Sequence, residues 1–313
     1  MKKYIILSVI TVLSLSSCYK EKEIHADPGE PRYTIEDSDD PLDHAIYEIY
    51  RKTGVHILYT YELNDYLWDL GSLRNSENRL TMQTDRAVLL EGLTYLDQVL
   101  FSVYQDAFKQ GFFPLKIFLA DSIDLQNTTA REDLLCASGR EYIVIGRLRA
   151  GGIPSTAAEI TTAQGLLNAH LWANLIIKNR LLVLPDAFSE ISSVFYGANY
   201  RYVKGQQQGV GATDIPYPTR AQLMDEGFWD IEQSNSQNFP IQNPNTGVYN
   251  TYAMMPTYEG DIYQFVQMIT TRGKTELMTL MEGHEKIITK YNILVQAIKD
   301  QCEIDLQEIG NSR

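Results

Sequence analysis

Residues 85–110 read DRAVLLEGLTYLDQVLFSVYQDAFKQ and place the strongest folding constraint on this 313-residue chain. Apolar side chains recur there at helical spacing, at Val88, Leu89, Leu93, Leu96, Val99, Leu100 and Val103. A helix with so wide an apolar face is stable only where other elements cover that face. We therefore predict a long buried helix that ends just before Gly111, since glycine commonly follows the last helical turn.

Strand signals follow and precede this helix. The strand candidates are residues 55–63 (VHILYTYEL), 114–125 (PLKIFLADSIDL) and 140–148 (REYIVIGRL). Helical patterns are found in residues 41–53, 155–179 and 259–306, whereas residues 197–260 are rich in Gly, Asn, Gln, Tyr and Pro and are expected to be mainly loops. This order predicts an α+β fold, a single domain with a mainly helical C-terminal half.

The N-terminus predicts export and lipidation. Residues 1–17 have two lysines followed by an apolar run, which is typical of a secretory signal peptide. The ending LSSC resembles a bacterial lipobox, so Cys18 is expected to be lipidated, with an ordinary cleaved signal as the alternative. Residues 18–40 are polar and acidic and are expected to be a flexible tether, which leaves 41–313 as the domain. The motif YKEKE after Cys18 resembles a tag for export to the outer surface of a Gram-negative outer membrane.

The net charge indicates which partners to exclude, and the cysteine content indicates which disulfide is possible. The formal charge is −13, and removal of Lys2 and Lys3 with the signal peptide changes it to −15. Such a chain is expected to repel nucleic acid and anionic headgroups. Cys136 and Cys302 remain after lipidation of Cys18, and they can either pair outside the cytoplasm or stay free thiols.

The helix AHLWAN raises the question of a metal site. His170 and Asn174 lie four residues apart, so both are expected to point to the same side of an apolar helix. In a zinc hydrolase motif HExxH, two histidines at this spacing bind the metal and the glutamate after the first activates water. Spacing alone indicates only a buried polar pair that needs hydrogen-bond partners.

The chain as a whole resembles the zinc-metallopeptidase lipoproteins, also called substrate import-associated zinc metallohydrolases, that accompany Sus-type TonB-dependent importers. The similarity covers most of residues 41–309 and rests on the lipobox, the strand GVHILYTYEL, the run Phe188, Glu190, Ile191 and Ser192, and the pair Gly227 and Phe228 within EGFWDI. The resemblance implies a zincin-like fold, in which a small mixed sheet packs on a long helix and on the metal-site helix.

The sequence departs from this family at the catalytic positions. His170 matches the first histidine, but Leu171 replaces the general base and Asn174 replaces the second histidine. The later acidic motif aligns with GDIYQ, so Gln264 replaces the third ligand. We therefore expect no catalytic residues, no bound metal and no cofactor.

The leading hypothesis from the sequence is an inactive, lipid-anchored accessory protein of an outer-membrane importer. Its expected partners are a TonB-dependent importer, the lipoprotein partner of that importer, and a peptide or glycan. One alternative is an active zinc metallohydrolase with a site rebuilt from His170 with Asp261 or Glu259. Another is a purely structural importer subunit whose cleft is filled by Leu171 and Trp172.

Overall fold

The structure is a computed structural model that describes residues 33–66, 79–124, 134–205, 218–231, 241–242, 249–250 and 253–312. The compact unit runs from Ile35 to Arg313. The expected signal peptide, Cys18 and most of the expected tether lie outside the described residues. Residues 35–40, which the sequence places in the tether, are part of the compact unit, because Ile35 packs on the core and Asp40 caps the first helix.

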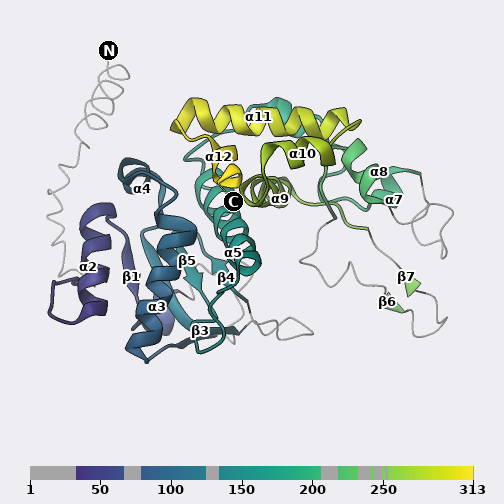
Figure 1. Cartoon of the computed structure of the whole chain (residues 1–313). Helices are drawn as coiled ribbons and strands as arrows, with labels where there is room; N and C mark the ends of the chain where they lie inside the picture. Colours follow the sequence, from purple (N-terminus) through teal and green to yellow (C-terminus); the bar gives the residue numbers. More distant parts are fainter. Residues whose placement is uncertain are drawn as a thin grey trace, which may run out of the picture. The chain divides into compact units, whose positions relative to one another are not determined.

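The domain has the predicted α+β architecture, with a small mixed sheet (Figure 1). Its strands are β1 (His56–Leu58), β2 (Arg79–Met82), β3 (Lys116–Asp124), β4 (Cys136–Ser138) and β5 (Tyr142–Ile145). The main path is β1-β3-β5-β4, and β2 pairs with the second half of β3. β3 is parallel to β1 and β5, β2 is antiparallel to β3, and β4 is antiparallel to β5. Because β4 is last in the strand order, it forms one edge of the sheet.

The helices that accompany the sheet come in three groups. The first is α2 (Pro41–Thr53), α3 (Arg86–Leu96), the π-helix η3 (Asp97–Phe101) and α4 (Asp106–Phe112). The second is α5 (Ala157–Ala169), which continues directly into the π-helix η4 (His170–Ile177), where contacts with β4 and β5 form. The third is the helical C-terminal half, comprising α9 (Tyr258–Thr271), α10 (Lys274–Leu280), α11 (Glu285–Cys302) and α12 (Leu306–Asn311).

Short elements connect these groups. They are η1 (Leu63–Asp65), α6 (Asp186–Glu190), α7 (Tyr200–Val203), α8 (Arg220–Asp225), β6 (Ile241–Gln242) and β7 (Tyr249–Asn250). One hydrophobic core extends from α2 and the sheet through α5, η4 and α9 to α12. A smaller cluster forms around Phe195 and Phe228. No helix in the described part of the chain is long and apolar enough to cross a membrane.

The single long helix predicted over 85–110 is wrong in detail, because the chain bends after η3 and Gly111 lies inside α4. The bend places Tyr104, which is 4% exposed, into the interior against η4. Its hydroxyl accepts a hydrogen bond from Trp172 Nε1 (2.7 Å) and donates to Asn168 Oδ1. After the bend, α4 ends at Phe112, since Pro114 disfavours a helical conformation in the residue before it, Phe113.

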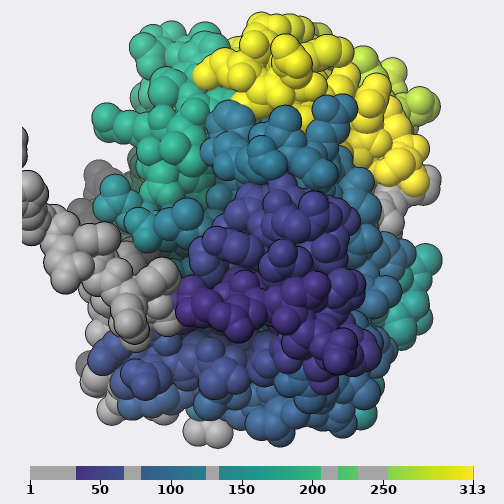
Figure 2. Space-filling view, turned by 90° about the vertical axis from the view of Figure 1, so that its left-hand side faces the viewer, coloured from purple at the N-terminus to yellow at the C-terminus, as the bar shows by residue number. Residues whose placement is uncertain are grey.

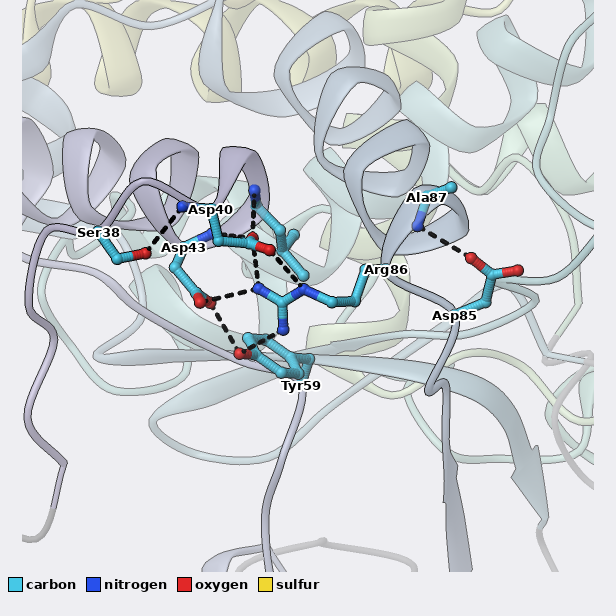
Figure 3. Close-up of polar contacts among 8 residues, drawn as sticks. Ser38, Asp40, Asp43, Tyr59, Asp85, Arg86 and Ala87 are labelled. Atoms are coloured by element: carbon cyan, nitrogen blue, oxygen red, sulfur yellow. Dashed lines mark hydrogen bonds and ion pairs between the residues drawn. The ribbon is translucent and has the colours of Figure 1, made fainter.

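A charged cluster ties the start of the domain to α3 (Figure 3). Arg86 donates hydrogen bonds to Asp40, to Asp43 Oδ2 (2.8 Å) and to the hydroxyl of Tyr59 (3.1 Å). Asp40 also accepts from the backbone N–H of Leu42 at the start of α2. The cluster is partly exposed, so its main effect is on the orientation of α2 and its contribution to stability is small.

Replacing Tyr104 with Phe tests the buried contact between η4 and the bend. The change leaves Trp172 Nε1 and Asn168 Oδ1 without a partner in a dry interior, so the free energy of unfolding should fall by about 1–3 kcal/mol. Urea unfolding followed by circular dichroism measures this loss. Tyr50→Phe is the matched control, because the Tyr50 hydroxyl makes no hydrogen bond to the described residues; an equal loss in both variants would contradict the prediction.

Candidate functional site

The side chains of His170 and Asn174 do point to the same place, where they meet Ser138 on the edge strand β4. Ser138 Oγ lies 2.8 Å from His170 Nδ1. The Asn174 amide nitrogen Nδ2 lies 3.1 Å from Ser138 Oγ and 3.1 Å from His170 Nδ1. All three side chains are half-buried. The sequence prediction that the polar pair shares one side and needs partners is therefore confirmed.

These contacts define the state of the imidazole. Asn174 Nδ2 can only donate, so His170 Nδ1 must accept, and its single lone pair is shared between Asn174 Nδ2 and the Ser138 hydroxyl. The imidazole proton accordingly sits on Nε2, in the neutral tautomer that these partners favour. Burial lowers the pKa of His170 from 6.5 to about 4, so the ring is uncharged at neutral pH. The site is a neutral polar network, and a base with so low a pKa is poorly matched to proton transfer near pH 7.

Leu171 is the residue that the sequence resemblance aligns with the general base. Its side chain is fully buried, and it belongs to the main hydrophobic core. Trp172 is also fully buried and packs against Phe108, with ring centroids 5.3 Å apart. Leu171 and Trp172, which follow His170 on this helix, are therefore both part of the hydrophobic core.

The side chain that approaches His170 from α9 is Tyr263. The two rings meet edge to face, with centroids 5.2 Å apart and planes at 86°. Gln264, the expected third-ligand position, is turned toward the loop after α8. Its Oε1 accepts from the backbone N–H of Asp230 (3.0 Å), and its Nε2 donates to the carbonyl of Ile231 (3.1 Å).

Asp261 is on a different side of α9 from Tyr263, because two residues along a helix turn it by about 200°. It forms an ion pair with Lys290 of α11, and both side chains are fully buried. The hydroxyl of Tyr196 donates to the same carboxylate oxygen (2.7 Å). Glu259 lies in the first turn of α9, two residues before Asp261. The aspartate of the rebuilt-site alternative is therefore already paired with a cation.

Lys290 is enclosed by the residues that carry the family resemblance. Its ammonium lies 4.7 Å from the ring centroid of Phe188 and 4.6 Å from that of Phe228. It also donates to Ser192 Oγ (3.2 Å). Gly227 closes the cage with a φ of 84°, and a Cβ there would lie 2.8 Å from Ser192 Oγ. These motif residues hold a buried charge in place, which is a structural role.

The donor set around His170 does not fit a zinc ion. It consists of one imidazole, a hydroxyl, an amide and a phenol, and zinc sites in proteins use Cys, His and carboxylate ligands. In the part of the chain that the structure describes, no group of three or more His, Cys, Asp or Glu side chains is placed to hold a metal ion.

The two remaining cysteines do not pair in the structure. Cys136 is buried in β4, and Cys302 is half-buried at the end of α11. Burial raises the pKa of the Cys136 thiol to about 12, so this thiol is protonated and unreactive.

Comparisons with known proteins agree with this architecture. No protein-family model and no curated protein matches the chain. A solved structure that matches is described as a "putative zinc-binding metallo-peptidase" from Bacteroides caccae; the TM-score is 0.51 and the sequence identity 15%, over 88% of this chain and 93% of that chain. The fold is metallopeptidase-like. At this identity the similarity concerns the fold alone.

Sequence reasoning missed Ser138 and Tyr263. Ser138 lies in a three-residue strand, too short for a periodic signal. Tyr263 is adjacent in sequence to the expected Gln264, and only the rotation of α9 about its axis distinguishes them. Lys290 was also missed, although a lysine at an otherwise apolar position of a helix is a signal that a buried partner exists.

The lowered pKa of His170 predicts a pH-dependent stability. An unfolded histidine titrates near 6.5, so between pH 6.5 and 4 the unfolded chain binds a proton that folded His170 does not. Stability should therefore fall as the pH drops through this window, by about 1–3 kcal/mol from this residue. Urea unfolding at pH 7 and pH 4.5 measures this loss of stability. The His170→Gln variant should lose less stability between the two pH values, and identical losses in both proteins would contradict the prediction.

The buried ion pair predicts a large effect from a single replacement. Lys290→Met leaves the Asp261 carboxylate buried without a counter-charge, so the free energy of unfolding should fall by about 3–5 kcal/mol. The double change Lys290→Met/Asp261→Leu should recover most of that loss. Thermal and urea unfolding measure both. Lys286→Met on the same helix is the control, because the Lys286 ammonium is exposed and Glu226 keeps Lys204 as its counter-charge, so the loss should be at most about 1 kcal/mol.

Proposed function

We propose that this chain is a catalytically inactive relative of the zinc metallopeptidases, anchored to the outer membrane through a lipid on Cys18. It would serve a Sus-type, TonB-dependent importer as an accessory protein and would bind or present a peptide or glycan. The observation that carries the proposal is the bonding of His170. The side chains that meet this imidazole are those of Ser138 and Asn174, a hydroxyl and an amide, whereas zinc sites in proteins use imidazole, thiolate and carboxylate ligands.

The chemistry available at this place supports inactivity. Leu171 cannot accept a proton, and loss of a general base typically costs about 10²–10⁴-fold in rate. Without a metal ion to lower the pKa of water, a hydroxide nucleophile has no source at neutral pH. With a pKa of about 4, the His170 imidazole is neutral at pH 7 but is only a weak base there.

The same arrangement supports binding. β4 is an edge strand, so its outer backbone groups can pair with an extended peptide. Ser138, His170 and Asn174 add neutral hydrogen-bonding groups beside that edge, and Tyr263 adds an aromatic ring. Amides of a peptide and hydroxyls of a glycan are the ligands that such neutral groups match.

The importer and its lipoprotein partner enter the proposal through the sequence resemblance. The expected signal peptide, the lipobox at Cys18 and the tag YKEKE support an address on the cell surface. The acidic chain argues against nucleic acid as a partner.

The two alternative functions, an active hydrolase and a purely structural subunit, require different properties of the site. An active hydrolase would have to free Asp261 from Lys290 or recruit Glu259, and then bring a carboxylate to His170. A purely structural subunit would have no affinity for a free ligand, and the burial of Leu171 and Trp172 in the core is the observation that favours it.

Zinc content distinguishes an inactive site from an active one. After zinc incubation and desalting, the purified chain should retain no stoichiometric zinc, whereas Asn174→His should gain zinc because it restores two imidazoles at metal-ligand spacing. Asn174→Gln is the matched control and should not. Stoichiometric zinc in the unmodified chain that disappears in His170→Ala would overturn the proposal and favour the hydrolase.

Ligand binding then distinguishes a binding protein from a structural subunit. Isothermal titration with peptide and oligosaccharide pools should give a signal that Ser138→Ala/Asn174→Ala weakens. Co-purification of a TonB-dependent importer with the anchored chain, but not with Cys18→Ala, tests the assembly. Co-purification without any ligand affinity would favour the structural subunit.

A further inference from the structure

Three segments meet at the end of the sheet where its parallel strands begin. They are residues 109–116, which include the last turn of α4, and the loops 139–141 and 178–183, together called the basic ridge below. The backbone N–H of Lys116 donates to the carbonyl of Glu141 (3.4 Å), and Asn179 Nδ2 donates to the carbonyl of Arg140 (2.7 Å). Figure 2 shows part of this end, with the blue surface of α4 between the purple surface of α2 and the yellow C-terminal helices.

The basic ridge reverses the charge of the rest of the molecule. A chain with a net charge of −13 places five basic residues and one acid, Glu141, in these segments; the bases are Lys109, Lys116, Arg140, Lys178 and Arg180. Lys109 is paired with Asp106 (2.7 Å). Lys178 and Arg180 are exposed and have no acidic partner among the described residues, so their charge faces solvent.

Large apolar side chains stand exposed beside these charges. Leu115 is 59% exposed, Leu181 54% and Val183 63%. Leu182 and Leu184, between and after them, are buried, so the segment alternates like a strand. Gln301 of α11 fixes this alternation, because its amide accepts from the backbone N–H of Val183 (3.4 Å) and donates to the carbonyl of the same residue (3.0 Å).

Arg180 has an unfavourable backbone conformation. Its φ is 61°, the left-handed region that normally holds glycine after a helix. Its N–H donates to the carbonyl of Ile177 (2.9 Å) and closes the end of η4. Glycine would adopt this backbone conformation with less strain, so the turn itself does not explain an arginine at this position. The exposed guanidinium of Arg180 suggests instead a role at the surface.

We propose that the basic ridge rests on a membrane surface with anionic headgroups. Lys178 and Arg180 would contact the headgroup phosphates, and Leu115, Leu181 and Val183 would enter the interfacial layer between them. The inference rests on the proposed function in one respect, since the anchor at Cys18 keeps the chain near a bilayer. The net charge alone predicts repulsion from such a surface; the distribution of charge reverses that expectation for this end of the domain.

The form of the surface favours a bilayer over a protein partner. The exposed apolar side chains lie on segments between helices and strands, with cations beside them, which suits shallow insertion among headgroups. Asp186, Asp300 and Glu303 adjoin the segment that Gln301 holds, and these acids limit how far the contact can spread.

Vesicle co-sedimentation tests the proposal. The mature chain carrying Cys18→Ala, which can take no lipid, should bind vesicles of phosphatidylcholine with 30% phosphatidylglycerol (about 30% anionic lipid, so that charge attraction can act). It should bind vesicles of pure phosphatidylcholine far less. Lys178→Glu/Arg180→Glu and Leu181→Ser/Val183→Ser should each lower the partition coefficient about tenfold or more.

Two controls separate binding from folding. Arg220→Glu/Val194→Ser makes similar changes at exposed positions near the other end of α11 and should keep the partition coefficient within about twofold. Arg180→Gly should weaken vesicle binding without lowering the melting temperature, because glycine accepts the left-handed backbone.

Other results would overturn the inference. These are equal binding to both vesicle types, equal partition of the ridge and control variants, or no vesicle binding together with capture of an acidic soluble protein by the ridge. Labelling of the unmodified chain with radioactive palmitate in cells tests the anchor separately. Labelling that is lost in Cys18→Ala, together with vesicle binding that depends on the basic ridge, would support both proposals. Vesicle binding of the basic ridge without any labelling of the unmodified chain would contradict only the lipid anchor at Cys18.

Discussion

The ion pair between Lys290 and Asp261 is the interaction on which the C-terminal half of the domain depends. It is fully buried, and a buried charge is tolerated only where partner groups replace most of its lost hydration. Ser192, Tyr196 and Asp261 accept from the lysine ammonium, and four aromatic rings enclose it, those of Phe188, Tyr196, Phe228 and Phe265. The pair therefore joins α9 and α11 to the segment after α6 and the loop after α8. Motif residues that suggest an enzyme family are explained here by the need to hold one charge in the interior.

The second constraint is the position of the helix formed by α5 and η4. Its apolar side is fixed in the core by Leu171 and Trp172, so His170 and Asn174 necessarily face the edge strand β4. In this chain the polar groups bond to one another and form a neutral network beside the edge strand β4.

Much of the fold was predictable because long apolar patterns are local. The helix over 41–53, the strands containing Ile117 and Ile143, and the helices of residues 259–302 were all predicted from periodicity, and so was the shared side of His170 and Asn174. The break after η3 was not predictable, because it depends on the contact between Tyr104 and a helix more than sixty residues later. The strand β4 was missed because three residues carry no periodic signal, and with it the partner of His170.

The sequence by itself determined which functional groups the helix AHLWAN carries. Leu171 and Asn174 cannot supply a base or a second imidazole in any fold, since the functional groups are missing from the side chains. Only the tertiary structure decided what replaces them. It brings Ser138 to the imidazole, turns Tyr263 toward it in place of Gln264, and draws Asp261 away to Lys290. Each of these outcomes depends on the packing and rotation of elements distant in the chain, and a local pattern of residues contains no information about that geometry.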